Sequence, residues 1–307
     1  MRRLRGTAPE DATAALLRKA LRDRANLVVA ESAKLVADLR LSSLLPDLLA
    51  AFDRLFQDPV KTDPKCWAKT AIVKALTELE HCESAPFLRG FEHIQMEPVW
   101  GGKEDSAVQL RANSILGLVQ CADLTRSEVL RKLVDAMMDA ADPVRLEAVR
   151  AIEQMNGDEA VLLLRMKARF GDQRPVVIGH VFDALLRLER GRGAEFVAEH
   201  LKSGAPEVRD EAALALGASR LPEAVKVLIE TWNQPRDREF GSVLLRALSS
   251  SRQPSAIDFL IELVRSGISS DSALAVDALK IHDDSPEIRA AADQAKRERV
   301  ISSKNAL

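Results

Sequence analysis

Residues 142–152 read Asp-Pro-Val-Arg-Leu-Glu-Ala-Val-Arg-Ala-Ile, and residues 206–216 repeat the pattern as Pro-Glu-Val-Arg-Asp-Glu-Ala-Ala-Leu-Ala-Leu. In both stretches small and apolar residues are three or four positions apart, which places them along one face of a helix. An acid before a first-turn proline, as in Asp142-Pro143, is typical of a helix N-terminus. Each stretch therefore predicts an amphipathic helix whose apolar stripe must be covered by neighbouring helices.

A pair of one small and one aliphatic residue recurs along the chain and marks a repeat. The pairs are Ala75-Leu76, Gly117-Leu118, Ala151-Ile152, Ala184-Leu185, Ala215-Leu216, Ala247-Leu248 and Ala278-Leu279, at intervals of 42, 34, 33, 31, 32 and 31 residues. A second helical pattern lies between successive pairs, at residues 158–170, 194–202, 223–232 and 255–264, and residues 26–39 and 44–56 predict two earlier helices. Each repeat is thus predicted to be a helical hairpin.

One hairpin of this size cannot bury its own apolar stripe, so consecutive hairpins must stack. We therefore expect an all-α fold, a right-handed α-solenoid of about eight helical hairpins without strands. The long first interval indicates an insertion. The predicted organisation is a single solenoid over residues 1–307: a flexible basic N-terminus at 1–9, N-terminal hairpins at 10–95, an inserted loop at 96–105, regular repeats ending in a C-terminal cap helix (286–300) at 106–300, and a tail at 301–307.

The two opening stretches resemble the HEAT repeat, particularly its bacterial phycobilin-lyase-like class. The resemblance implies that the second helix of each hairpin lines a concave face. It also implies that an Asp six residues before the Arg joins a ladder between repeats. Asp105 with Arg111 and Asp139 with Arg145 keep this spacing, whereas Ser203 stands at the corresponding position before Arg209.

Enzymes are known among proteins that resemble this array. The repeated His-Glu iron ligands of deoxyhypusine hydroxylases are absent, and the charge balance does not match the basic, aromatic-rich groove of HEAT-like DNA glycosylases. Nothing singles out the chromophore handling of the bilin lyases, which remain an alternative. The five histidines form no His-Glu or i, i+4 pair, so we expect no metal site, no catalytic residues and no cofactor.

The composition narrows the classes of partner. Lys and Arg number 44 against 46 Asp and Glu, a formal net charge of −2, which argues against a nucleic-acid partner; the weaker alternative is nucleic-acid binding through Arg2, Arg3 and Arg5. No apolar run is long enough for a membrane span or a signal peptide. Three widely spaced cysteines fit reduced thiols, with Cys66-Trp67 on core-type helical positions. We expect a cytoplasmic protein without a membrane partner.

The inserted loop supplies the candidate site residues Trp100, Gly101 and Gly102, followed by Asp105 and Arg111. We favour a structural plug, in which Trp100 covers the seam between two hairpins; the alternative is a contact loop that presents Trp100 to a partner. Arg111, Arg145 and Arg209 suit a partner's carboxylates, although nearby acids favour salt bridges between repeats.

The absence of a catalytic motif favours a non-enzymatic scaffold or adaptor that binds a protein or peptide on the concave face. The predicted contact residues are those of the loop together with the three arginines. The alternative is a bilin-lyase-like enzyme or a carrier of a small ligand.

Overall fold

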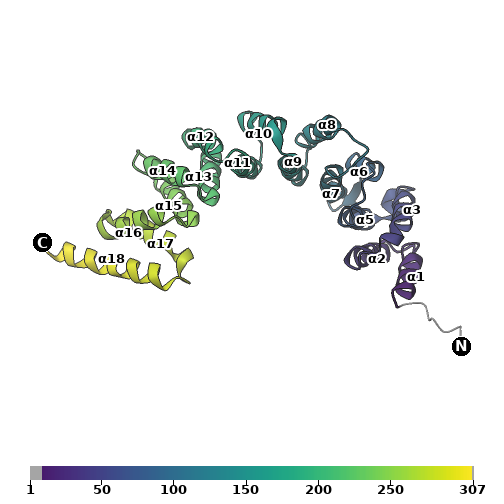
Figure 1. The fold of residues 1–307 in the computed structure, drawn as a ribbon, viewed down its shortest axis with the longest axis horizontal. Helices are drawn as coiled ribbons and strands as arrows, with labels where there is room; N and C mark the ends of the chain where they lie inside the picture. Colours follow the sequence, from purple (N-terminus) through teal and green to yellow (C-terminus); the bar gives the residue numbers. More distant parts are fainter. Residues whose placement is uncertain (1–8, 306–307) are drawn as a thin grey trace. The chain divides into compact units, whose positions relative to one another are not determined.

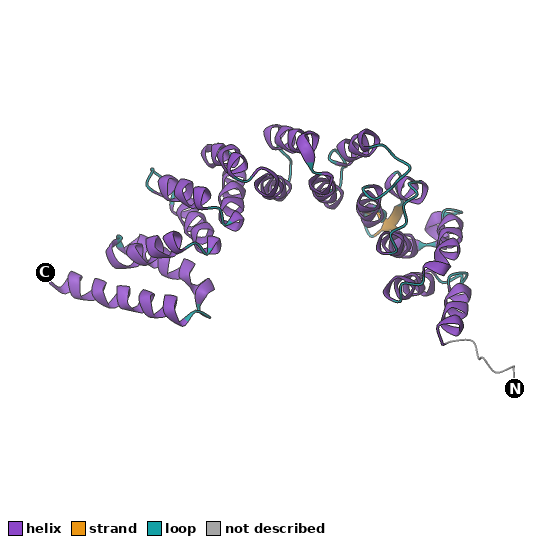
Figure 2. Cartoon of the chain, in the orientation of Figure 1, coloured by secondary structure: helices purple, strands orange, loops and turns teal. Residues whose placement is uncertain are grey.

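The computed structural model describes residues 9–305, which contain 18 α-helices and one two-stranded β-hairpin (Figures 1 and 2). The predicted basic N-terminus, apart from Pro9, lies outside the described residues. The chain divides between Met155 and Asn156 into two compact units. The single solenoid over 1–307 therefore stays a prediction, and each unit is described by itself.

Each unit is built from two rows of helices, which we call row A and row B. Successive row A helices pack against one another, and each row B helix packs against a row A helix. In the first unit, row A contains α2 (Asn26–Asp38), α5 (Trp67–Glu78), α7 (Val108–Leu118) and α9 (Asp142–Met155). Row B contains α1 (Pro9–Ala20), α3 (Leu45–Leu55), α6 (Ala85–Phe91) and α8 (Arg126–Ala136), and the short segments are η1 (Ser42–Leu44), α4 (Pro59–Thr62) and η2 (Pro64–Cys66).

The second unit continues the same alternation. Row A contains α11 (Pro175–Glu189), α13 (Pro206–Ser219), α15 (Arg238–Ser251) and α17 (Ser269–Leu279). Row B contains α10 (Gly157–Phe170), α12 (Gly191–Glu199), α14 (Pro222–Trp232), α16 (Pro254–Ser266) and α18 (Pro286–Asn305), with the short turns η3 (His200–Lys202) and η4 (Lys280–His282). Over residues 9–305 eight hairpins thus precede α18, and the predicted all-α solenoid architecture of about eight helical hairpins is confirmed.

The recurring pairs lie on the row A helices, and a glycine directly after one of them lies where two of these helices approach closely. All seven sequence pairs fall on row A helices, from α5 to α17, and their small and aliphatic residues are buried. At Gly217 on α13, an added Cβ would lie 2.2 Å from the backbone oxygen of Ala247 on α15. A side chain there would force the two helices apart, so Gly217 sets the spacing of α13 and α15.

Two predicted segments differ from the structure. Residues 96–105 are not a loop: Met96–Val99 (β1) and Gly102–Asp105 (β2) form an antiparallel hairpin in which Glu97 faces Glu104 (strands orange in Figure 2). The last helix does not end at Val300 but continues to Asn305, so residues 301–305 of the expected tail are helical. Within the described part of the chain, no helix is both long and apolar enough to cross a bilayer.

Candidate functional site

A groove runs along the row A helices of the first unit, between α2 and α5 and bordered by α7. Its volume is about 660 Å³. It is lined by Leu27, Ala30, Glu31, Lys34, Ala37, Asp38, Lys65, Trp67, Thr70, Ala71, Lys74, Ala75, Glu78 and Gln109. The floor is mostly alanine and the walls are long side chains, so a partner's backbone can approach the two helices closely.

The two helices that form the groove are parallel and begin side by side. The Asn26 side-chain nitrogen Nδ2, at the start of α2, donates to Asp63 Oδ1 (2.8 Å) and to the backbone oxygen of Pro64 (2.9 Å), just before α5. These two hydrogen bonds align α2 and α5 at their N-terminal ends. Leu27 and Trp67 therefore lie at the same end of the groove.

That end of the groove exposes unusually large apolar side chains. Trp67 is 47% exposed and Leu27 is 53% exposed. The Lys65 ammonium lies 5.8 Å from the centre of the Trp67 ring. The expectation that Trp67 packs in the core is wrong, because the first residue of α5 faces the groove.

Asp63 fixes where α5 begins. Its fully buried carboxylate accepts hydrogen bonds from the backbone N–H groups of Ala68 and Lys69, both at 2.9 Å, and Lys69 Nζ lies 3.3 Å away. Lys69 Nζ also donates to the backbone oxygen of Leu55 (3.4 Å). The cost of burying the Asp63 carboxylate is thus offset in two ways: by hydrogen bonds from N–H groups at the start of α5, and by the positive charge of Lys69.

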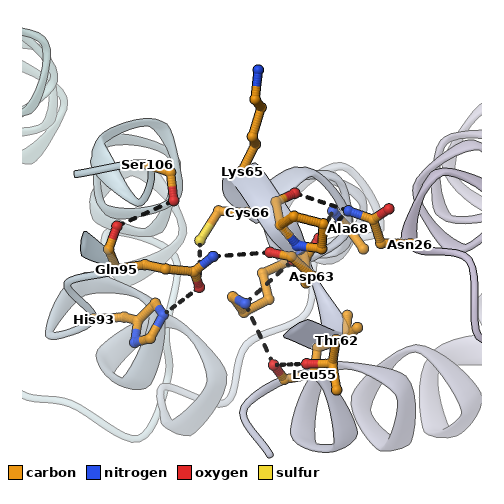
Figure 3. Close-up of polar contacts among 12 residues, drawn as sticks. Asn26, Leu55, Thr62, Asp63, Lys65, Cys66, Ala68, His93, Gln95 and Ser106 are labelled. Atoms are coloured by element: carbon orange, nitrogen blue, oxygen red, sulfur yellow. Dashed lines mark hydrogen bonds and ion pairs between the residues drawn. The ribbon is translucent and has the colours of Figure 1, made fainter. Parts of the chain in front are cut away.

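Between Asp63 and the helix, Lys65 and Cys66 both adopt left-handed backbone conformations, with φ of 62° and 54°. Such conformations cost roughly 1 kcal/mol or more for a residue with a Cβ, so surrounding contacts must hold them. They turn the chain so that Cys66 is buried and the Lys65 side chain points away from the buried network, as Figure 3 shows.

Gln95 stands at the centre of that network (Figure 3). Its Nε2 donates to the Asp63 backbone oxygen (2.9 Å) and to Glu97 Oε1 (2.7 Å). Its Oε1 accepts from the Cys66 thiol (3.2 Å) and lies 3.1 Å from His93 Nε2. One buried amide thereby connects the start of α5 to the base of the hairpin.

Glu97 anchors the hairpin to the same point. Its Oε1 accepts from the backbone N–H of Lys65 (2.6 Å) and from the Ser106 hydroxyl. Burial raises the pKa of Glu97, but the hydrogen bonds from Ser106, Gln95 and the Lys65 backbone outweigh it, so the pKa is lowered overall. The ionised carboxylate thus holds the hairpin against the groove's apolar end.

The thiol of Cys66 is not set up as a nucleophile. Burial raises its pKa to about 11, which keeps it protonated near neutral pH. Over residues 9–305, no group of three or more His, Cys, Asp or Glu side chains is arranged to hold a metal ion.

The structure places Trp100 at the tip of the hairpin, fully exposed at 103%. The plug interpretation is therefore wrong, because Trp100 covers no seam between hairpins. Gly101 next to it has a φ of +89°, which favours glycine, whereas a Cβ at Gly102 would meet nothing within 4 Å. The hairpin presents an aromatic side chain on a tight turn.

The Arg111 side chain is buried and is bonded to other residues of the chain. Its Nη1 lies 2.6 Å from Asp105 Oδ2 and donates to the His93 backbone oxygen (3.1 Å), and its Nε lies 2.9 Å from Asp139 Oδ2, in the following repeat. The hydrogen bonds to both carboxylates outweigh burial, which on its own lowers the pKa of Arg111, and the net shift is upward. The contact of Arg111 with Asp139 is one link of the kind that the resemblance to the HEAT repeat implied.

The other two predicted arginines are also engaged within the chain. Arg145 is buried and its Nη1 donates to the backbone oxygens of Asp139 (2.9 Å) and Ala140 (3.1 Å). Arg209 Nη2 lies 3.2 Å from Asp237 Oδ2, and its guanidinium lies 3.9 Å from the centre of the Phe240 ring. Of the predicted site residues, the structure brings Asp105 and Arg111 together.

The groove itself was missed by the sequence prediction. The available signal was the alignment of Leu27, Lys34 and Asp38 with Trp67, Lys74 and Glu78, at offsets of seven and eleven residues in both helices. That signal becomes visible only when α2 and α5 are known to start at the same level.

The family model for HEAT repeats matches residues 194–280, from within α12 to η4. Residues 194–280 therefore match HEAT repeats. In the matched part these HEAT repeats are the regular hairpins α12/α13, α14/α15 and α16/α17. The phycobilin-lyase-like class and the cytoplasmic location stay predictions.

Several solved structures are similar to the chain. Human deoxyhypusine hydroxylase in complex with glycerol is 19% identical, with 78% of this chain and 84% of that chain covered and a TM-score of 0.32. An engineered protein is 18% identical, with 92% and 82% covered and a TM-score of 0.38, and a second engineered protein is 15% identical, with 91% and 97% covered and a TM-score of 0.29. No curated protein sequence matches the chain.

Proposed function

We propose that the chain is a non-enzymatic scaffold that binds a protein or peptide in the groove between α2, α5 and α7. The observation that carries the proposal is the exposure of Trp67 and Leu27 at one end of a groove with an alanine floor. Tryptophan is enriched among the residues that dominate binding energy, and arrays of helical repeats commonly present extended binding surfaces.

The contact surface differs from the one expected from the sequence. Arg111 and Arg145 are buried and bonded within the chain, so they are removed from the proposed contacts. Trp100 is retained as a second contact, because the hairpin that carries it is fixed to the start of α5 through Glu97. Lys65 joins the surface at the apolar end of the groove.

The test is selection of binding peptides from a displayed random library on the full chain, followed by affinity measurement with a Trp67→Ala variant. Loss of an aromatic anchor costs about 2 kcal/mol or more, which is roughly a 30-fold loss of affinity. Phe170→Ala is the matched control, since it removes an exposed aromatic side chain outside the groove. Circular dichroism verifies that both variants fold.

Selected peptides that keep their full affinity for Trp67→Ala would refute the groove as the binding site. A small ligand that co-purifies with the chain and competes with the peptides would favour the carrier alternative.

A further inference from the structure

The charged side chains along the groove lie at two levels, meaning two distances from the apolar end at which α2 and α5 each contribute one residue. Counting from Leu27 on α2, Lys34 is seven residues further and Asp38 eleven residues further. Counting from Trp67 on α5, Lys74 and Glu78 have the same offsets. At 1.5 Å per residue, the lysines lie about 10 Å and the acids about 16 Å from the apolar end.

The two series face each other because α2 and α5 are parallel and aligned. The hydrogen bonds from Asn26 to Asp63 and Pro64 hold their N-terminal ends together. All six side chains line the one groove. The groove thus has an apolar end, a middle with two lysines and a far end with two carboxylates.

The pairs that these charges make within the chain are weak. Lys34 lies 2.6 Å from Glu31, and Lys74 lies 3.8 Å from Glu78, but all four side chains are exposed. Exposed ion pairs contribute at most about 1 kcal/mol, so a partner can exchange with them. Asp38 makes no ion pair with any residue from 9 to 305. The formal charges of Lys34, Lys74 and Glu31 sum to +1 in the middle of the groove, and those of Asp38 and Glu78 sum to −2 at the far end.

The shape of the groove suits a helix. A third helix packs against two parallel helices at interaxial distances of 8–10 Å when the side chains between them are small. Ala30, Ala37, Ala71 and Ala75 supply such a floor. On a helix, positions i, i+7 and i+11 share one face, so one helix can meet the apolar end and both charged levels at once.

We propose that the occupant of the groove is an amphipathic helical segment of a partner protein, with an apolar anchor, an acidic residue seven positions away and a basic residue four positions further. The anchor packs on Leu27 and Trp67, the acid pairs with Lys34 and Lys74, and the base pairs with Asp38 and Glu78. This inference rests on the proposed function and adds the chemistry of the partner.

The test uses synthetic alanine-based helical peptides of 15 residues. The matched peptide carries Leu at position 2, Glu at 9 and Lys at 13; the swapped peptide has the same composition with Lys at 9 and Glu at 13. Both are also made in the reverse direction, since either direction can present the same order along the groove. Binding is followed by Trp67 fluorescence in a Trp100→Phe background, in which Trp232 is buried.

In the better direction, the matched peptide is expected to bind about tenfold more tightly than the swapped peptide. Replacement of both lysines by Glu and of Asp38 and Glu78 by Lys is expected to reverse the preference. The variant with only Lys34→Glu and Lys74→Glu is expected to bind the matched and swapped peptides equally well. This double variant keeps the test valid should the fourfold variant not fold.

Equal affinity of matched and swapped peptides would overturn the inference. If neither peptide binds while library peptides still bind through Trp67, the inference fails and the proposed function stands. If no peptide of either kind depends on Trp67, both fail.

Discussion

Replacement of Lys69 by methionine tests whether the Asp63–Lys69 pair holds the start of α5 and the groove beside it. Both side chains are fully buried, with 3.3 Å between Nζ and Oδ2. Methionine fills a similar volume but removes the counter-charge. Asp63 then keeps only its hydrogen bonds from two backbone N–H groups and from Asn26.

Breaking a buried pair by removing one partner costs about 3 to 5 kcal/mol. We expect the lower end, about 3 kcal/mol, because three hydrogen bonds to the carboxylate remain. For a domain of this size, each kcal/mol lowers Tm by about 2 to 4 °C, so the first unit is expected to lose about 6 to 12 °C. A double variant with Asp63→Asn as well is expected to regain at least half of that loss, since no charge stays buried alone.

The assay is thermal unfolding combined with amide hydrogen exchange, which resolves the two units. Protection is expected to fall in α2, α5 and the hairpin and to stay unchanged in α13 and α15. Lys61→Met is the matched control, because Lys61 is exposed and makes no ion pair with a described residue. A loss below about 1 kcal/mol, or a double variant no more stable than Lys69→Met, would refute the reasoning.

Three further predictions concern single groups. Burial lowers the pKa of His93 below its ordinary 6.5, so the unfolded chain binds the proton first and the first unit loses stability as pH falls below about 6.5; His93→Gln should flatten that profile in thermal melts. With a disulfide reagent at pH 8, exposed Cys82 should react first, and Cys66 and Cys121, whose pKa values burial raises to about 11 and about 12, only on unfolding. Gly217→Ala should destabilise the second unit by about 1 to 3 kcal/mol in urea titrations, because the new Cβ meets the backbone of α15.

Helices and their pairing were determined by the sequence itself. The apolar stripe of a helix is a local pattern, since residues three and four apart share a face whatever they pack against. The row A helices and the hairpin count therefore followed from spacing alone. The ladder from Arg111 to Asp139 was likewise implied by the spacing that the chain shares with HEAT repeats.

The hairpin at Met96–Asp105 was not predictable in the same way. Its strands have four residues each and no apolar alternation. Their conformation depends on Gln95 and Glu97, which bond to the Asp63 and Lys65 backbones about thirty residues away. Only the packed structure brings these segments together.

The exposure of each aromatic side chain was also decided by tertiary structure. The helical periodicity places Trp67 among the apolar positions expected in the core. The left-handed turn at Lys65 and Cys66, beside the N-terminal end of α2, instead leaves the Trp67 side chain facing the groove. Trp100 is exposed because the hairpin base, and not its tip, is held. Periodicity shows which residues share a face of a helix. The packing of segments remote in sequence decides whether that face is covered. The candidate site lies on a face of α2 and α5 that no other described segment covers.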